Sequence, residues 1–210
     1  MNILIATTNK NKVDRIRRLI TDQDINFISL SDLDYKIEEP EENGKDGVEN
    51  AIIKAKYYFE KLKFKMPVLT QDDTLFLSGV SDEDNPKKDI KLPITKKYGQ
   101  FNDDFAYKYY LDLVDKYNKK YLDMEFRYGH AICGENFLEG SYSVLPGRLY
   151  GQINTTRTLG YFLADLIKFN VNGIWKYNSD LNEEELINQD KYIKESIISL
   201  LKELKNNTSV

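Results

Sequence analysis

The chain begins with a short apolar run, a polar loop and a pattern typical of an amphipathic helix. Residues 3–5 are apolar and largely β-branched, which predicts a buried parallel strand. Residues 7–12 are polar, and after them apolar side chains recur at helical spacing, at Val13, Ile16, Leu19 and Ile20. Thr8 or Asn9 can serve as the N-cap, so the pattern places the polar loop at a helix N-terminus.

A second strand and a second helix are predicted next. Residues 26–30 favour a short strand, and a polar segment rich in glutamate follows over residues 31–47. Asp46 and Glu49 have the spacing of a capping box, in which two side chains satisfy free N–H groups at a helix start. The predicted helix carries one apolar stripe, formed by Val48, Ile52, Ala55, Phe59 and Leu62.

Polar side chains accompany this helix and the strand after it. Asn50 and Lys54 are four residues apart, so we expect them to share a helix face other than the apolar stripe. Residues 67–70 predict a third strand, which ends in the run 71–73. That run contains two adjacent aspartates, Asp72 and Asp73, and two carboxylates at a strand end are unusual enough to mark as candidate chemistry.

The middle of the chain predicts an exposed excursion and a further helix. Residues 81–91 are charged, contain proline and show no periodicity, which indicates an exposed loop. Asn102 is the predicted cap of a helix that runs to about residue 118, with one broad side formed by Phe105, Tyr109, Leu113 and Tyr117. The tyrosines of this helix suit either the core or the surface of a partner subunit.

The last part of the chain predicts a hairpin and a C-terminal helix. Residues 124–133 and 137–145 have strand patterns, and turn residues join them. A glycine-bearing third strand is expected over residues 146–153, and a loop containing Arg157 closes at 160–162. Residues 183–205 predict one amphipathic helix. No internal repeat or low-complexity tract is found.

Composition narrows the class of protein. With 210 residues and 41% hydrophobic content, the chain can form one large domain or two small lobes around a cleft. The net charge of -4 argues against a non-specific nucleic-acid binder, although a module that uses the basic residues 10–18 is a minor alternative. One cysteine, Cys133, and one histidine, His130, exclude an internal disulfide framework and a zinc cluster.

Hydropathy indicates where the protein works. No stretch approaches the roughly 20 apolar residues that a bilayer span needs, and the N-terminal apolar run lacks a charged region before it. We therefore expect no membrane partner. The single cysteine and the missing leader favour the reducing cytoplasm.

The polar loop at residues 7–12 is a candidate anion site. Free backbone N–H groups and the helix dipole favour phosphate at a helix N-terminus, and Lys10 and Lys12 add positive charge. The loop is not a glycine-rich P-loop, so an ordinary strand-to-helix turn with solvated lysines is the alternative.

The lysine on the second helix and the two aspartates extend this candidate into a metal and phosphate site. Proteins usually hold Mg²⁺ with one or two carboxylates and the phosphate oxygens of the substrate. Consecutive strand residues point to opposite faces, so Asp72 and Asp73 would not both bind one metal from a regular strand. One would bind the metal while the other orients water. A solvated turn and a solvated Lys54 are the alternative.

Three linked motifs resemble the inosine triphosphate pyrophosphatase family, whose members hydrolyse deaminated purine nucleoside triphosphates. The family pattern Thr-x-Asn-x-x-Lys follows the first strand; Glu-x-Gly precedes an Asn-Ala-x-x-Lys helix; and a pair of acidic residues follows a later strand. These motifs fall, in order, on Thr7, Asn9 and Lys12, on Glu42 and Gly44, on Asn50, Ala51 and Lys54, and on Asp72 and Asp73. The match covers residues 3–77.

The resemblance weakens in the second half of the chain. Residues 147–153 look like the family's Gly-x-x-x-Gly-x-Ile strand. The family's Gly-Tyr/Trp-Asp-Pro-x-Phe motif appears only as residues 160–163, without the Asp and the Pro, and the C-terminal Ser-His-Arg motif is missing. A Pro-Gly turn that the family has after the acidic pair is replaced by the excursion at 81–91. The end that reads the base therefore departs from the family.

The resemblance implies a fold and an activity. It implies a single α/β domain over residues 1–210, with a long mixed central β-sheet flanked by helices and two lobes around a nucleotide cleft. The implied activity is Mg²⁺-dependent cleavage of a nucleoside triphosphate to the monophosphate and pyrophosphate, and the implied assembly is a homodimer. A nucleotide-binding protein that has lost or altered turnover is the alternative.

The implied site contains catalytic, metal-binding and substrate-binding groups. Asp72 would orient or deprotonate the attacking water, and Mg²⁺ would be held by Glu42 and Asp73; the alternative exchanges the roles of the two aspartates. Lys54 and Lys12 would neutralise the triphosphate. The remaining expected substrate contacts are Thr7, Thr8, Asn9, Asn50 and, for the base, Arg157 and Tyr161.

Overall fold

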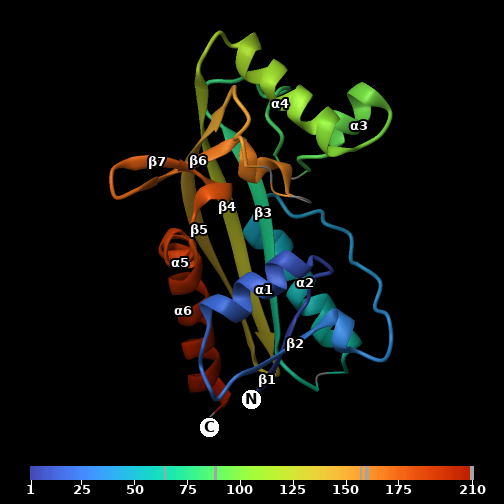
Figure 1. Ribbon diagram of the computed structural model, residues 1–210. Coiled ribbons are helices and arrows are strands. Elements are labelled where there is room, and N and C mark those ends of the chain that lie inside the picture. Colours follow the sequence, from blue (N-terminus) through green and yellow to red (C-terminus); the bar gives the residue numbers. More distant parts are fainter. Residues whose placement is uncertain (64, 88, 157, 159–160, 209–210) are drawn as a thin grey trace. The chain divides into compact units, whose positions relative to one another are not determined.

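The computed structural model describes residues 1–63, 65–87, 89–156, 158 and 161–208. Its seven strands are β1 Asn2–Ile5, β2 Asn26–Ser29, β3 Val68–Leu77, β4 Tyr121–Gly134, β5 Phe137–Tyr150, β6 Ile167–Val171 and β7 Ile174–Tyr177 (Figure 1). The α-helices are α1 Lys10–Leu19, α2 Gly47–Lys61, α3 Leu92–Tyr98, α4 Asp103–Lys116, α5 Glu183–Gln189 and α6 Lys191–Thr208. Short 3-10 helices lie at η1 Leu30–Asp32, η2 Phe162–Asp165 and η3 Asn178–Asp180.

The strands form one mixed sheet in the order β2-β1-β3-β4-β5-β6-β7. β1 is parallel to both of its neighbours, while β6 is antiparallel to β5 and to β7. This arrangement confirms the predicted α/β class with a mixed central sheet. No helix among the described residues is long and apolar enough to cross a membrane.

By their contacts the residues divide into two compact units. The first contains residues 1–73, 128–143 and 190–210, and the second contains residues 74–127 and 144–189. The expected single domain, with two lobes around a nucleotide cleft, stays a prediction. The three long strands β3, β4 and β5 each contribute residues to both units.

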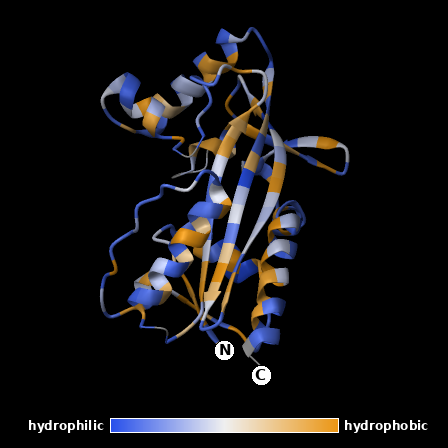
Figure 2. Cartoon of the chain, turned by 180° about the vertical axis from the view of Figure 1, so that it is seen from behind, coloured by the Kyte–Doolittle hydropathy of each residue, from blue (hydrophilic) through white to orange (hydrophobic). Residues whose placement is uncertain are grey.

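In the first unit, α2 covers one face of the sheet and α1 covers the other (Figure 1). Strand geometry explains the division, since alternate residues point to opposite faces. Thr70 of β3 faces α2, because its hydroxyl donates to the Ala51 carbonyl at 2.6 Å. The core on that side includes Leu4, Val68, Ala131 and, from α2, Ala51, Ala55, Tyr58 and Phe59. In Figure 2 the helices of this unit carry both hydrophobic and hydrophilic colours, as helices with one buried face do.

The predicted cap of α1 is confirmed, and the helix starts directly after it, inside the segment predicted as the polar loop. Asn9 is the N-cap, and its side chain accepts a hydrogen bond from the Asn11 N–H at 3.0 Å. Lys10 and Lys12 therefore belong to the first helical turn and not to the loop, which is a correction. The helix buries Val13, Ile16 and Leu19, as predicted.

The capping prediction for α2 is confirmed, with one change of partner. The Asp46 side chain accepts from the Glu49 N–H at 2.9 Å, while Glu49 reaches back to the Lys45 N–H and not to that of Asp46. The prediction that Asn50 and Lys54 share a helix face is confirmed, because both side chains donate to Asp72, although Asn50 is fully buried at 0% exposed. Hydrogen bonds to Gly44 and Asp72, described below, satisfy its amide.

The third strand does not end at the aspartates. β3 continues through them to Leu77, so the predicted strand end at residues 71–73 was wrong. Asp72 and Asp73 are thus consecutive residues of a regular strand and point to opposite faces. Pairing with the neighbouring strands outweighs the low strand propensity of aspartate here.

A close backbone approach fixes α2 on the sheet. A Cβ added at Gly129 of β4 would lie 2.1 Å from the carbonyl carbon of Gly47, the first residue of α2. Gly47 in turn lies against the Asp72 carbonyl, 3.4 Å from where its own Cβ would be. Only a residue without a side chain fits at position 129, so this glycine allows the start of α2 to rest on β3 and β4.

β4 and β5 form the predicted hairpin, since they are adjacent in the sheet and only Glu135 and Asn136 connect them. The expected separate strand at residues 146–153 was wrong. β5 runs without a break from Phe137 to Tyr150 and includes Pro146 and Gly147.

The second unit holds the excursion and the tyrosine-rich helix. The described residues of the predicted excursion, 81–87 and 89–91, are mostly exposed, as expected, but two side chains anchor the segment: Asp84 accepts hydrogen bonds from Lys116 and Tyr117, and the buried Asn85 bonds both backbone groups of Leu77. Helix α3 was not predicted. Asn102 caps α4 as expected, but the buried side of α4 is Ala106, Tyr107, Tyr110, Leu113 and Val114.

Two further features were missed or misjudged. β6 and β7 form a hairpin that was not predicted, although its turn residues Asn172 and Gly173, both with positive φ, are typical of such a turn. The predicted continuous helix at residues 183–205 is two helices, α5 and α6, which are interrupted at Asp190. The interruption coincides with the passage of the chain from the second unit to the first.

Candidate active site

Lys54 of α2 joins two of the predicted carboxylates. Its ammonium donates to Glu42 Oε1 at 2.7 Å and to Asp72 Oδ1 at 2.9 Å. The exposed fractions of the side chains are 15% for Lys54, 37% for Glu42 and 9% for Asp72. Burial lowers the pKa of Lys54, but the hydrogen bonds to the two carboxylates outweigh it and raise that pKa. Lys54 is therefore held as a fixed positive charge between two acids.

Asn50 positions Asp72 from inside the protein. Its Nδ2 donates to Asp72 Oδ2 at 3.1 Å, and its Oδ1 accepts the Gly44 N–H at 2.8 Å. Both oxygens of Asp72 are thus engaged, one by Asn50 and one by Lys54. Because Asn50 also binds the backbone two residues after Glu42, it couples the acidic segment to the strand.

Asp73 lies on the opposite face of β3 and pairs with Lys12 of α1. The Asp73 side chain is 31% exposed and that of Lys12 is 18% exposed, so this pair is more open to solvent than Asp72. The predicted lysines and carboxylates of the site therefore form two ion-paired groups. Lys12 pairs with Asp73, and Lys54 pairs with Glu42 and Asp72. All five residues belong to the first unit.

The loop between β1 and α1 lines the larger of the two pockets described here. Thr7 Oγ1 accepts the Asn9 N–H at 3.2 Å, and Thr8 Oγ1 donates to Glu39 at 2.9 Å. The pocket has a volume of about 690 Å³ and includes Thr7, Thr8 and Lys10, together with residues of the 29–39 segment. Pockets of this size accommodate nucleotide-sized ligands. Lys12 and the two aspartates do not line it.

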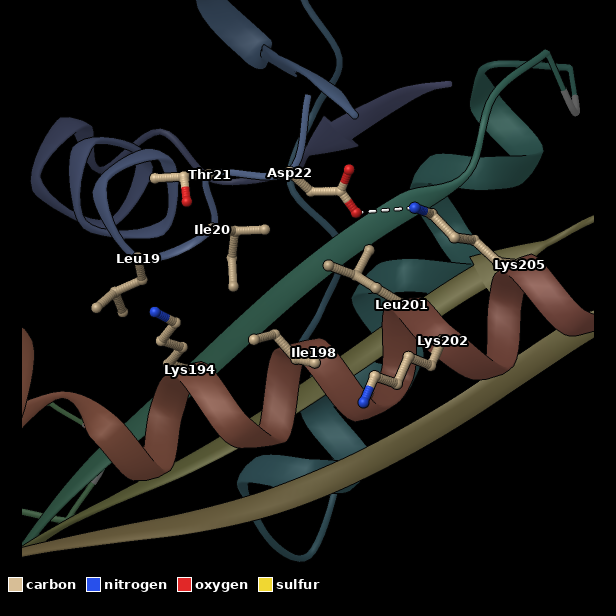
Figure 3. A pocket seen from close by; sticks show the side chains of 9 residues that line it. All are labelled: Leu19, Ile20, Thr21, Asp22, Lys194, Ile198, Leu201, Lys202 and Lys205. Atoms are coloured by element: carbon tan, nitrogen blue, oxygen red, sulfur yellow. Dashed lines mark hydrogen bonds and ion pairs between the residues drawn. The ribbon is translucent and has the colours of Figure 1, made fainter. Parts of the chain in front are cut away.

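A second pocket lies away from every predicted site residue. It has a volume of about 350 Å³ and lies between the end of α1 and helix α6 (Figure 3). Figure 3 shows that its lining includes the apolar side chains of Ile20 and Ile198. Lys205 pairs with Asp22 at 2.8 Å at this pocket. The predicted anion chemistry belongs to the other end of α1.

Two arginines of α1 that make long-range contacts were not predicted. Arg15 lies on α1, and its guanidinium donates to the Tyr128 hydroxyl at 3.4 Å and stacks 4.9 Å from the centre of that ring. Arg18 pairs at 3.1 Å with the buried Asp190, whose pKa is raised by burial. The sequence did contain a signal for them, because the basic residues Lys12, Arg15 and Arg18 follow one another at intervals of three.

Of the two residues expected to contact the base, the structure describes only Tyr161. Arg157 lies outside the described residues. Tyr161 belongs to the second unit, where it immediately precedes η2. In that unit Asp165, which was not predicted, is 0% exposed and accepts hydrogen bonds from Tyr107 at 2.6 Å and from the Thr158 N–H at 3.0 Å. Asp165 thus connects Thr158 to α4.

The carboxylates described above are the candidate ligands of a metal ion. Within the part of the chain that the structure describes, no group of three or more His, Cys, Asp or Glu side chains is placed to hold an ion. Mg²⁺ needs fewer protein ligands, because substrate phosphates and water complete its octahedron. Glu42 and Asp73 are the two more exposed carboxylates, and each already faces a positive charge. Glu42 pairs with Lys54 and Asp73 pairs with Lys12 on the other face of β3, so a metal held by Glu42 and Asp73 together with its substrate stays a prediction.

Comparisons with known proteins identify the family of the chain. The model of the Ham1 family matches residues 3–162. A dITP/XTP pyrophosphatase of Dictyoglomus thermophilum is 35% identical over 81 residues, which are 39% of this chain and 38% of that protein. One from Haemophilus influenzae is 38% identical over 79 residues, again 38% of each chain. The chain thus aligns with well under half the length of these relatives.

Solved structures share the fold. A HAM1 protein from Coxiella burnetii has a TM-score of 0.73 at 20% identity and covers 97% of this chain and 99% of its own. The Staphylococcus aureus Ham1 protein has a TM-score of 0.67 at 19% identity and covers 99% of this chain and 100% of its own. At this identity, the likeness describes the fold alone.

Proposed function

Because this chain belongs to the Ham1 family, we propose that it is a nucleoside triphosphate pyrophosphatase, which cleaves its substrate to a nucleoside monophosphate and pyrophosphate. One observation carries the proposal: in a single unit, Lys12 of α1 pairs with Asp73 on one face of β3, and Lys54 of α2 pairs with Asp72 on the other face and with Glu42. The names of the relatives, dITP/XTP pyrophosphatases, support the substrate class.

The phosphate chain would be bound by the start of α1 and by the two lysines. The first N–H groups of a helix and its dipole attract anions, and α1 has no acidic residue in its first turn to compete. Lys12 and Lys54 are held in place by carboxylates, so little side-chain freedom is lost when phosphate binds. Thr7, Thr8 and Asn9 would position the substrate from the loop, while buried Asn50 acts through Asp72.

Mg²⁺ is the proposed cofactor, held by Glu42 and Asp73. When bound, Mg²⁺ would neutralise phosphate charge and polarise the reacting phosphoryl group. The greater exposure of these two side chains favours them over Asp72, whose two oxygens are already occupied. The roles of the two aspartates can be exchanged without changing the rest of the proposal.

Asp72 is the proposed group that orients or deprotonates the attacking water. Asn50 and Lys54 fix its carboxylate in one orientation, which is the preorganisation that general-base catalysis needs. Attack at the α-phosphorus places the leaving charge on pyrophosphate, and Lys12 and Lys54 would stabilise that charge. A covalent intermediate is not needed, since His130 and Cys133 are both buried.

The identity of the base is a separate matter. Tyr161 and Arg157 are the proposed base contacts, by stacking and hydrogen bonding, and a deaminated purine is the proposed base. The missing Ser-His-Arg and Asp-Pro elements keep a second reading open, in which the protein binds nucleotide but has lost or altered turnover. We also propose that the protein forms a homodimer and is located in the cytoplasm. The burial of Tyr107 and Tyr110 inside the second unit leaves fewer tyrosines of α4 for a partner.

The test is to incubate the purified full chain with Mg²⁺ and a panel of common and deaminated nucleoside triphosphates, and to measure pyrophosphate and phosphate separately. We expect pyrophosphate and a monophosphate from at least one nucleotide. Release of phosphate alone would contradict attack at the α-phosphorus. Binding of a nucleotide without any product would favour the second reading.

A further inference from the structure

Behind Asp73, two buried polar side chains from neighbouring strands have no protein partner for some of their atoms. Gln71 is 4% exposed and His130 is 0% exposed. Among the described residues, no protein group makes a hydrogen bond with Gln71 Nε2, Gln71 Oε1 or His130 Nδ1. Buried polar atoms are almost always hydrogen-bonded, so each of these needs a partner that is not a protein group.

The two residues lie directly opposite each other. Two contacts fix the register of β3 against β4. The position that a Cβ would take at Gly47 is 3.4 Å from the Asp72 carbonyl oxygen and 3.4 Å from the Gly129 nitrogen. The Thr70 hydroxyl is 3.4 Å from the Ala131 carbonyl oxygen. Asp72 therefore faces Gly129, and Thr70 faces Ala131, in an antiparallel register. Gln71 and His130 are the pair between them, and they point to the α1 side, where such side chains come within about 4.5–5.5 Å at Cβ.

The chemistry of this pair fits water. The His130 ring is neutral, because burial and the nearby charge of Arg15 lower its pKa to about 3. Its Nε2 already shares a hydrogen bond with Ser143 Oγ at 3.1 Å. A neutral imidazole nitrogen and an amide that offers both donors and an acceptor can be satisfied by water, which donates and accepts. Arg15 and Lys12 make the surroundings unfavourable for a cation.

The pair is next to the proposed metal ligand. Gln71 and Asp73 are alternate residues of β3 and therefore share a strand face. The same register places Asp73 opposite Tyr128, and the charge of Asp73 is close enough to influence His130. A water that is hydrogen-bonded to Gln71 would thus lie on the same face of β3 as the Asp73 side chain and close to it.

We propose that Gln71 and His130 bind an internal water molecule on the α1 side of the sheet, and that this hydrated pair positions Asp73. The water site stands on geometry alone. The positioning role rests on the proposed pyrophosphatase function. Gln71 and His130 are positioning residues, since both are too buried to touch substrate.

The water site is tested first on the wild-type protein. A crystal structure of the full chain, at a resolution that shows ordered water, is expected to place a water within hydrogen-bonding distance of both the Gln71 amide and His130 Nδ1. A direct contact between the two side chains, or a dry gap, would overturn the water site. This measurement needs neither a variant nor a substrate.

A double-mutant cycle tests the coupling in solution. Gln71→Met and His130→Leu each remove one polar partner, and each is expected to lower the melting temperature by about 2–4 °C, because the water and the other side chain lose a bond. The double variant is expected to lose less than the sum. Additive effects, or a rise in melting temperature for Gln71→Met, would mean that the two groups are not bridged. Gln23→Met, at an exposed position of the same unit, is the matched control and should change nothing.

Kinetics test the positioning of Asp73. With the nucleotide that the wild type cleaves best, Gln71→Met is expected to reduce kcat about tenfold while KM changes little, because a displaced catalytic group slows the chemistry more than binding. An unchanged kcat would overturn the positioning role. If the wild type released no pyrophosphate, the proposed function and the positioning role would both fail, and the water site would still be decided by the structure and the cycle.

Discussion

Asp72 and Asp73 are adjacent in the chain, yet they bind lysines on opposite faces of the sheet. Asp72 pairs with Lys54 of α2, and Asp73 pairs with Lys12 of α1. Strand alternation enforces this separation, because β3 continues through both residues. The two carboxylates consequently differ in burial and in partners, and substitutions at the two positions should have different effects on stability.

Asp73→Asn is expected to reduce pyrophosphate release at least about 100-fold while the free energy of unfolding changes by no more than about 1 kcal/mol. The side chain is 31% exposed, and an exposed ion pair contributes little to stability. Initial rates and urea unfolding check the two parts. A fully active variant would show that the metal ligand has been assigned wrongly.

Asp72→Asn is the matched comparison and is expected to lose both activity and stability. The side chain is 9% exposed and engages Lys54 and Asn50, so neutralising it leaves a half-buried lysine short of one acid. We expect a loss of about 1–3 kcal/mol in the free energy of unfolding, measured with urea. Equal stability of the Asp72 and Asp73 variants would contradict the proposed division between the faces.

Lys54→Met tests the lysine between two acids. Removing the ammonium leaves Asp72 and Glu42 without their shared cation, and we expect a higher KM for the nucleotide together with a loss of about 1–3 kcal/mol in stability. Lys45→Met is the control on the neighbouring turn. Its side chain is 90% exposed and 4.0 Å from Glu49, so that change should stay within about 0.5 kcal/mol.

Gly129→Ala is expected to destabilise the protein severely. The new methyl group would lie 2.1 Å from the Gly47 carbonyl carbon, and backbone atoms on both sides cannot move aside without lifting α2 from the sheet. A loss of about 3 kcal/mol or more, or failure to fold, is expected. Gly173→Asn is the control, because nothing lies within 4 Å of a Cβ there and asparagine tolerates positive φ.

Acid should destabilise the fold partly through His130. Burial lowers the pKa of this ring to about 3 from an ordinary value of 6.5, so between these values the unfolded chain binds a proton that the folded protein does not. Stability is therefore complete above about pH 6.5 and falls as the pH drops toward 3, by up to about 1.4 kcal/mol per pH unit from this group.

The measurement is urea unfolding between pH 7 and pH 4 for the wild type and for His130→Gln. All other titrating groups are shared, so the difference between the two curves isolates the histidine. We expect a shallower pH dependence in the variant. Parallel curves would mean that the ring is not held neutral in the folded protein.

The sequence by itself determined the elements that depend on local patterns. Hydrophobic periodicity and capping residues predicted β1, α1, α2 and α4, and the caps Asn9, Asp46 and Asn102 are all confirmed. The linked motifs predicted the family, which the family model confirms. These features are encoded within a few neighbouring residues, because caps and amphipathic faces use interactions between residues three or four apart.

Only the tertiary structure decided which side chains are buried and which meet. The fully buried Asn50, the continuation of β3 through two aspartates and the opposition of Gln71 and His130 all depend on contacts between distant segments. Pairing with neighbouring strands keeps β3 regular where its residues would favour a turn. Charge and hydrogen-bonding partners then compensate burial, and these partners lie far away in the chain: Lys12 reaches Asp73, and Asn50 reaches Asp72, only after the sheet has formed.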